Sequence, residues 1–266
     1  MLSLEFETVE LDVAEGVATI TLNRPDALNA WTRKLGGEVN EALDHIAVDP
    51  EVRALVITGA GRAFSSGADL REAGQLTPDG KPDVLSELRD IYNPLILRVR
   101  TLPKPVVAAV NGAAVGIGCS LALAADLIVA AESAYFLLAF VNIGLALDGG
   151  ASAFLPARVG HARATEIAFL GERIPAATAL EWGLVNRVVA DEQIASAAGE
   201  LARGLAAGPP GAYAAIKQTL GEHSYRQLAQ ALDREAVLQQ ERAESADFTE
   251  GVMAFLQKRP ARFTGA

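Results

Sequence analysis

The stretch NGAAVGIGCSLAL (residues 111–123) follows the apolar run PVVAAV, and a shorter counterpart, AFSSGADL (residues 63–70), follows the run RALVITG. Each is expected to join a buried strand to a helix, because a short apolar run that ends in glycine is typical of a strand. Such turns expose backbone N–H groups at the positive end of a helix, which suits a phosphate, a carboxylate or a developing oxyanion. The alternative is that these glycines only form tight turns.

Outward from the two loops, the pattern first alternates strands with helices and then becomes helical. Strands are predicted at residues 17–23, 53–59, 105–112 and 127–131, and helices at residues 31–46 and 85–102. From Ala151 onward helical patterns dominate, with breaks at glycines and prolines. This order predicts an α/β core of parallel βα units that is closed by a helical C-terminal lobe.

Length and charge narrow the classes of function. The 266 residues fit one large domain, or a main domain with a smaller lobe. The formal net charge of −10 argues against a nucleic-acid partner, since binding to phosphates requires clustered lysine and arginine. Local basic residues could still meet the phosphates of a small cofactor.

Cysteine usage and the N-terminal residues suggest the compartment. A single cysteine, Cys119, cannot form an internal disulfide, and no C-x-x-C pair or histidine cluster offers a metal site. The N-terminus lacks the basic start and apolar run of a signal peptide, and no apolar stretch is long enough to span a membrane. We expect a cytoplasmic protein with no metal and no membrane partner.

Three later stretches extend the pattern of the two glycine loops. They are IGLALDGGASAFLPARVGHARA (residues 143–164), ERIPAATALEWGLVNRVV (residues 172–189) and DFTEGVMAFLQKRPARF (residues 247–263). Over nearly the whole chain, the five stretches resemble the crotonase, or enoyl-CoA hydratase/isomerase, superfamily. The pattern is most similar to members that isomerise enoyl-CoA or ring-derived (epoxyphenylacetyl) CoA.

The resemblance implies a crotonase (ClpP/crotonase) spiral of βα units. Residues 1–200 would form the core with the CoA site, and residues 201–266 a helical lobe that assembles a homotrimer or a dimer of trimers. The substrate would be an acyl-CoA thioester, with no cofactor beyond its CoA moiety. Two backbone N–H groups, which map onto Ala68 and Ile117, would bind the thioester oxygen. Ile117 departs from the usual glycine, and its alternative role is packing alone.

The resemblance also assigns a CoA site. Its residues would be Arg24, Ala27, Leu28, Ala63, Phe64, Ser66, Asp69, Leu70, Phe255 and Lys258. Arg24 could pair with a phosphate, or could be an exposed arginine of a turn. Phe255 and Lys258 would reach the adenine or phosphates, in some relatives from a neighbouring subunit, although Lys258 could equally end a helix in solvent.

The acid and base residues depart from those of hydratases. The two hydratase glutamates correspond to Ser120 and Phe140, which cannot act as a carboxylate pair. Asp148, in IGLALDGG, instead falls where isomerases and dehalogenases of the superfamily place a catalytic aspartate. Among apolar neighbours its pKa would rise toward useful basicity. The alternative is that Asp148 caps the helix that follows.

Four functions therefore remain open at this point. Double-bond isomerisation with Asp148 as the base is favoured, because one base suffices to move a proton between two carbons. Hydration of an enoyl-CoA by atypical acid and base residues is the second hypothesis. A noncatalytic acyl-CoA binder is the third, and hydrolysis or dehalogenation with Asp148 as nucleophile is the fourth. Trp31 and Trp182 are expected on helices outside both glycine loops, which disfavours an aromatic dehalogenase pocket.

Overall fold

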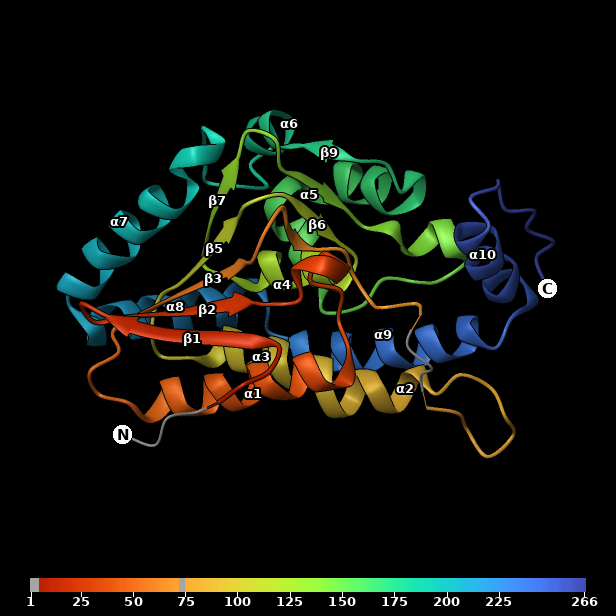
Figure 1. The fold of residues 1–266 in the computed structure, drawn as a ribbon, viewed down its shortest axis with the longest axis horizontal. Coiled ribbons are helices and arrows are strands. Elements are labelled where there is room, and N and C mark those ends of the chain that lie inside the picture. The colour runs from red at the N-terminus through yellow and green to blue at the C-terminus, as the bar shows by residue number, and fades with distance from the viewer. Residues whose placement is uncertain (1–4, 72–74) are drawn as a thin grey trace.

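The computed structural model describes residues 5–71 and 75–266, and its largest element is a six-stranded sheet (Figure 1). Only the first strand runs antiparallel to its neighbour. In spatial order the strands are β1 (Val9–Ala14), β2 (Val17–Leu22), β3 (Ala54–Gly59), β5 (Val106–Val110), β7 (Leu127–Ala131) and β10 (Arg187–Val189). The predicted strands β2, β3, β5 and β7 are confirmed, and they lie in parallel as expected.

A second sheet of four short strands contains the glycine loops. Its strands are β4 (Ala63–Ser65), β6 (Ala113–Val115), β8 (Tyr135–Leu137) and β9 (Ile174–Pro175). Each glycine stretch follows a buried strand as expected, and the second leads directly into a helix at Ile117. The stretches also contain the short strands β4 and β6, which were not predicted and which pair in parallel, with Ala63 opposite Ala113. Parallel pairing puts the carboxyl ends of β4 and β6 at the same edge of the sheet.

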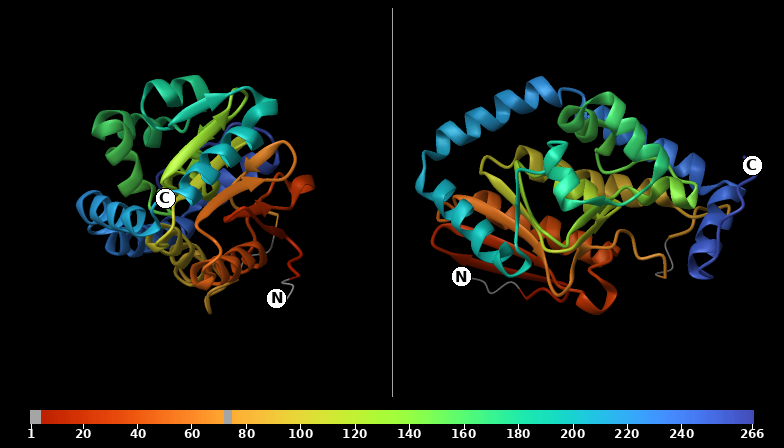
Figure 2. Two further views of the ribbon diagram at one scale, coloured as in Figure 1. Left: turned by 90° about the vertical axis from the view of Figure 1, so that its left-hand side faces the viewer. Right: turned by 90° about the horizontal axis from the view of Figure 1, so that it is seen from above.

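Helices cover both faces of the larger sheet, as Figures 1 and 2 show. The helices α1 (Arg33–Val48) and α3 (Asn93–Thr101) share a core with Ile20, Leu55 and Ile57 of the sheet. The helix α7 (Ile194–Ala207) packs its buried alanines on Val56 and Val107, which point to the opposite face. Side chains alternate between the two faces of a strand, so these two clusters confirm a layered α/β core.

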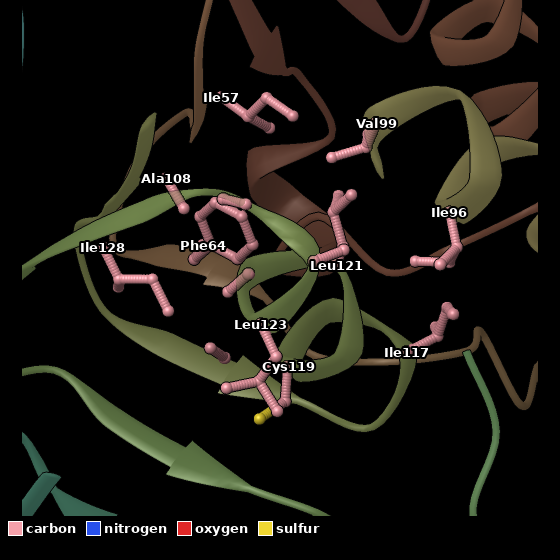
Figure 3. Packing of buried hydrophobic residues seen from close by; sticks show 14 of the residues in the cluster. Ile57, Phe64, Ile96, Val99, Ala108, Ile117, Cys119, Leu121, Leu123 and Ile128 are labelled. Carbon is pink, nitrogen blue, oxygen red and sulfur yellow. The ribbon is translucent and has the colours of Figure 1, made fainter. Parts of the chain in front are cut away.

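The remaining elements close the core around the glycine loops. The region expected as one helix at residues 85–102 consists of α2 (Val84–Glu87), a π-helical segment η2 (Leu88–Tyr92) and α3. The others are η1 (Pro25–Ala27), α4 (Ile117–Ala124), η3 (Ala139–Ile143), α5 (Ala151–Leu170), α6 (Ala176–Glu181) and η4 (Asp191–Gln193). Phe64, Ile117 and Leu121 are among the core side chains in Figure 3. Within the described ranges, no helix has both the length and the apolar character needed to cross a bilayer.

Three C-terminal helices complete the chain: α8 (Pro210–Ser224), α9 (Leu228–Ala243) and α10 (Ala246–Leu256). The helix α9 runs back along the molecule beside α2, α3 and α5, while α10 lies at one end (Figure 1). The expected boundary at residue 200 falls inside α7, whose alanines are buried on both sides of it. The division into core and lobe stays a prediction.

Candidate functional site

Two glycines bring the predicted oxyanion donors together. Gly67 has a φ of +89° and Gly116 a φ of +52°, a region that residues with a side chain rarely adopt. A Cβ built on Gly67 would lie 3.2 Å from the Val115 carbonyl oxygen and 3.9 Å from the Gly116 Cα. The two turns are therefore in contact, and each glycine directly precedes a predicted donor, Ala68 or Ile117.

Neither predicted donor group is occupied by another residue of the described chain. The Ile117 N–H is the first of α4, and neither it nor the Ala68 N–H donates a hydrogen bond to another residue in the described part of the chain. The Ile117 side chain is 3% exposed and lies in the hydrophobic core (Figure 3). The buried side chain shows that Ile117 packs in the core, while the role of its N–H as an oxyanion donor stays a prediction.

The segment that carries Asp148 packs on the first turn of α4. A Cβ built on Gly149 would lie 2.7 Å from both the Ile117 Cδ1 and the Ser120 Cβ atoms. The Ser120 hydroxyl donates a hydrogen bond of 2.9 Å to the carbonyl oxygen of Asp148. The packing of Gly149 on Ile117 and Ser120 places Asp148 beside the first turn of α4.

The carboxylate of Asp148 is buried and is hydrogen-bonded on one side. Its Oδ2 atom accepts a hydrogen bond of 3.0 Å from Nε2 of Gln239, whereas its buried Oδ1 atom has no partner within residues 5–71 and 75–266. Burial raises the pKa of Asp148 well above the usual aspartate range, and the charges of Glu235 and Glu87 raise it further. The hydrogen bond from Gln239 opposes this rise in pKa. Such a carboxylate is more basic than an ordinary aspartate, and its Oδ1 atom is the oxygen without a protein donor among the described residues.

The helix-cap alternative for the Asp148 side chain is wrong. Glu235, on α9, accepts hydrogen bonds from the N–H groups of Gly150 at 2.7 Å and Ser152 at 2.9 Å. These are donors at the start of α5, where Asp148 contributes only its carbonyl oxygen, to the N–H of Ala151 at 3.1 Å. The Asp148 carboxylate therefore lacks the N–H partners that would lower its basicity.

Ser120 and Phe140 lie beside the same turns. Ser120 is fully buried, and the ring of Phe140 would lie 3.8 Å from a Cβ built on Gly116. Both positions that hold glutamates in hydratases thus adjoin the donors but carry no carboxylate. Asp148, with Glu235 and Glu87 near it, supplies the acidic groups of this site.

The structure joins the two segments predicted to hold the CoA arm. The Ser66 N–H donates to the Leu28 carbonyl oxygen at 3.0 Å, and the Ser66 hydroxyl to the Ala27 carbonyl oxygen at 3.3 Å. The side chain of Asn29, which is fully buried, donates to the Ala63 carbonyl oxygen at 2.8 Å. These bonds hold the turn after β2 against β4 and its loop.

Arg24 spans the same two segments. Its guanidinium donates to the Ala30 carbonyl oxygen and forms an ion pair of 3.1 Å with Asp69. With 24% of its side chain exposed, Arg24 is not the exposed turn arginine of the alternative interpretation. Its role toward a phosphate stays a prediction, and any such contact would share the guanidinium with Asp69.

The other predicted CoA residues are less well placed within one chain. The Phe64 side chain lies fully inside the core, so only its backbone could meet a ligand (Figure 3). Leu70 is half-buried after the first loop. Phe255 and Lys258 are exposed on and after α10, at the end of the molecule (Figure 1). The role of these two residues in CoA binding stays a prediction.

Trp31 lies next to the first glycine loop and not on a helix. Thr32 caps α1, so Trp31 precedes the helix and its backbone pairs with the first glycine loop. The Trp31 N–H donates to the Gly67 carbonyl oxygen at 2.8 Å. The expectation that Trp31 lies on a helix is therefore wrong; it lies outside both glycine loops, as expected, and belongs to the core with 1% of the residue exposed.

Sequence reasoning missed Glu235 and Gln239, which reach Asp148 from α9. Both are polar residues in a buried stripe that otherwise consists of Leu228, Leu232, Ala236 and Ala243. Polar side chains at the apolar positions of an amphipathic helix are a usable signal of a buried polar partner. Gln239 and its partner Asp148 are 91 positions apart in the sequence.

The chain matches a known protein family over most of its length. Residues 12–266 match the family model described as enoyl-CoA hydratase/isomerase. The chain is 42% identical to 1,2-epoxyphenylacetyl-CoA isomerase of Escherichia coli (strain K12), covering 95% of this chain and 97% of that protein. It is 43% identical to a probable enoyl-CoA hydratase of Rhodobacter capsulatus, covering 98% and 100%.

A solved structure shows the same fold. The crystal structure of an enoyl-CoA hydratase from Mycobacterium avium subsp. paratuberculosis K-10 superposes with a TM-score of 0.88 at 40% identity, covering 98% of this chain and 100% of that one. The expected crotonase fold is thus confirmed, together with an acyl-CoA enzyme as its function. The chain belongs to the enoyl-CoA hydratase/isomerase family.

Proposed function

We propose that this enzyme isomerises a double bond in an unsaturated or ring-derived acyl-CoA, with Asp148 as the base. The observation that carries the proposal is the buried Asp148 carboxylate, whose Oδ1 atom has no partner among the described residues. It lies beside a turn with an available N–H, while both hydratase glutamate positions lack a carboxylate. The relative named as a 1,2-epoxyphenylacetyl-CoA isomerase supports the same class of reaction.

The reaction needs one base and one oxyanion site. The thioester oxygen would accept hydrogen bonds from the N–H groups of Ala68 and Ile117. Asp148 Oδ1 would remove a proton from a carbon conjugated to the thioester, and the electron pair would move to that oxygen as an enolate. Asp148 would then return the proton to the other end of the conjugated system. Each donor can stabilise the enolate-like transition state by roughly 3 to 4 kcal/mol.

The CoA moiety would lie along the two joined segments. Arg24, Ala27 and Leu28 come from the turn after β2, and Ala63, Phe64, Ser66, Asp69 and Leu70 from the first glycine loop. Phe255 and Lys258 would complete the site from α10 of a neighbouring subunit in a homotrimer or hexamer. The enzyme would act in the cytoplasm and use no cofactor other than the CoA of its substrate.

A panel of acyl-CoA esters tests the proposal. Purified enzyme is incubated with 3-enoyl, 2-enoyl and aromatic-ring-derived CoA esters, and the double-bond position and product mass are followed by mass spectrometry. Isomerisation gives a product of unchanged mass. Gain of one water would establish a hydratase, halide release from a halogenated ester a dehalogenase, and binding without turnover a noncatalytic acyl-CoA binder.

Two variants assign the chemistry to residues. Asp148→Asn keeps the shape of the side chain but removes the base, so turnover should fall by about a hundredfold or more, as expected for loss of general base catalysis. Ser120→Ala removes a hydroxyl at a hydratase glutamate position and should retain most of the activity. Equal losses in both variants would contradict a distinct role for Asp148.

A further inference from the structure

Two residues on one face of α9 define the surroundings of the Asp148 carboxylate. Glu235 and Gln239 are one helical turn apart, so their side chains extend in the same direction. Glu235 is 5% exposed and Gln239 is 0% exposed. Both reach the segment from Ala146 to Ser152, which carries Asp148, from a helix near the C-terminus of the chain.

Gln239 can face the Asp148 segment in only one orientation of its amide. Its Nε2 atom donates to two acceptors, the Ala146 carbonyl oxygen at 2.7 Å and Asp148 Oδ2 at 3.0 Å. A flipped amide would turn its oxygen toward both of these oxygens and lose both bonds. The amide therefore occupies Oδ2 and leaves Oδ1 as the carboxylate oxygen without a protein donor in the described part of the chain.

The same amide carries a cost that packing alone does not explain. Its Oε1 atom is buried and has no hydrogen-bond partner in the part of the chain that the structure describes. A buried polar atom without a partner costs about 1–3 kcal/mol, and an apolar side chain of this size would avoid that cost. Such sites are expected where a residue serves function and not only stability.

Glu235 takes the hydrogen-bond donors that Asp148 would otherwise attract. The N–H groups at the start of α5 are unsatisfied within the helix, and an aspartate just before a helix is a favoured acceptor for them. Glu235 accepts two of these N–H groups, from Gly150 and Ser152. Its carboxylate also places a negative charge near Asp148.

We propose that Glu235 and Gln239 are positioning residues that make Asp148 a one-sided base, Glu235 by occupying the N-terminus of α5 and Gln239 by holding Oδ2 so that Oδ1 faces the substrate. This inference rests on the proposed function of Asp148. It assigns part of the active site to α9, in the C-terminal third of the chain. Neither residue needs to touch the substrate in this role.

The two residues should affect the pH profile in opposite directions. The kcat/KM of a general-base reaction falls on the acidic side as the base becomes protonated. The charge of Glu235 raises the pKa of Asp148, whereas the hydrogen bond from Gln239 lowers it. The Glu235→Gln variant should therefore shift the acidic limb to lower pH, and Gln239→Met should shift it to higher pH. The remaining charge near Asp148, Glu87 on α2, is unchanged in both variants.

Matched controls lie on the exposed face of the same helix. Glu241→Gln removes one carboxylate, and Gln230→Met removes one amide, and both residues are exposed. Neither control should move the acidic limb. Gln239→Met should also lower kcat by up to about a hundredfold with little change in KM, since a small misplacement of a catalytic group can cost that much.

The experiment measures kcat and KM from acidic to alkaline pH for wild type, both variants and both controls, with thermal unfolding and CoA binding as checks of folding. Opposite limb shifts support the proposal. Limbs that stay at the wild-type pH, with Asp148→Asn still inactive, overturn the positioning role but leave Asp148 as the base. Activity in Asp148→Asn overturns the proposed function itself. If Glu235→Gln does not fold, Gln239→Met, which changes no charge, decides by the sign of its shift, and no shift overturns the proposal.

Discussion

Replacing Gly116 by alanine tests the turn that presents the Ile117 N–H. Gly116 has a φ of +52° and a ψ of −126°. A Cβ at this position would have only ordinary contacts, 3.7 Å from the Gly67 Cα and 3.8 Å from the Phe140 Cε1 atom. Steric clash therefore does not decide the outcome. The backbone conformation does, and it costs a residue with a side chain about 1–3 kcal/mol.

This cost must appear either in stability or in turnover. If the backbone keeps its conformation in Gly116→Ala, the free energy of unfolding should fall by about 1–3 kcal/mol. If the backbone relaxes, the Ile117 N–H turns away and the enzyme loses part of the roughly 100- to 1,000-fold in kcat that one oxyanion donor provides.

The assay combines chemical denaturation with steady-state kinetics on the acyl-CoA ester that is isomerised. Gly37→Ala is the matched control, because Gly37 lies in α1, has no positive φ and has nothing within 4 Å of a built Cβ. The control should be stabilised by up to about 1 kcal/mol and keep its kcat. Wild-type stability together with wild-type kcat in Gly116→Ala would refute the role of this turn.

Three further predictions concern stability and assembly. Asp148→Asn should be more stable than wild type at neutral pH, because the pKa of Asp148 is raised in the folded state, so that folding stability falls as pH rises through that pKa. Thermal unfolding at fixed protein concentration should show that the difference in stability between the two proteins shrinks toward acidic pH. A difference that does not depend on pH would contradict the raised pKa of Asp148. The protein should form a homotrimer or a dimer of trimers, since large apolar side chains such as Phe169 and Phe255 are 74% and 63% exposed in a single chain; a monomer mass by light scattering would contradict this. Free CoA at about 100 times its Kd should stabilise the fold by about 2.7 kcal/mol, measured as a rise in Tm, and an unchanged Tm with millimolar CoA would argue against the CoA site.

Much of the fold could be predicted from local patterns. The strands β3, β5 and β7 are apolar runs of five or six residues buried in the centre of the sheet, and such runs carry their own signal. The strands β4 and β6 have only three residues each, inside glycine-rich stretches, so they form because they pair with each other. No local pattern predicts that pairing. The predicted start of α1 at Trp31 is two residues early, because the apolar period begins at Trp31 whereas the side chain of Thr32 caps the helix.

Some residues of the candidate site could be predicted from local motifs, and others could not. Ala68, Ile117 and Asp148 follow recognisable motifs, and the structure brings the turns that carry them into contact. Glu235 contacts Gly150 across 85 positions of the sequence, and Gln239 contacts Asp148 across 91. These contacts form only because α9 packs against α5 in the folded chain. The sequence shows only that two polar residues interrupt an apolar stripe. It does not show which group they serve.

Hydrogen exchange in D₂O tests the central claim most directly, because removal of a proton beside the thioester by Asp148 is the step on which isomerisation depends. Wild-type enzyme and Ser120→Ala should incorporate deuterium at the carbon beside the thioester during prolonged incubation with an acyl-CoA, as read by mass spectrometry and NMR. In Asp148→Asn this incorporation should vanish while CoA still binds. Incorporation at the wild-type rate in Asp148→Asn would show that another group removes the proton, and would contradict the assignment of Asp148 as the base.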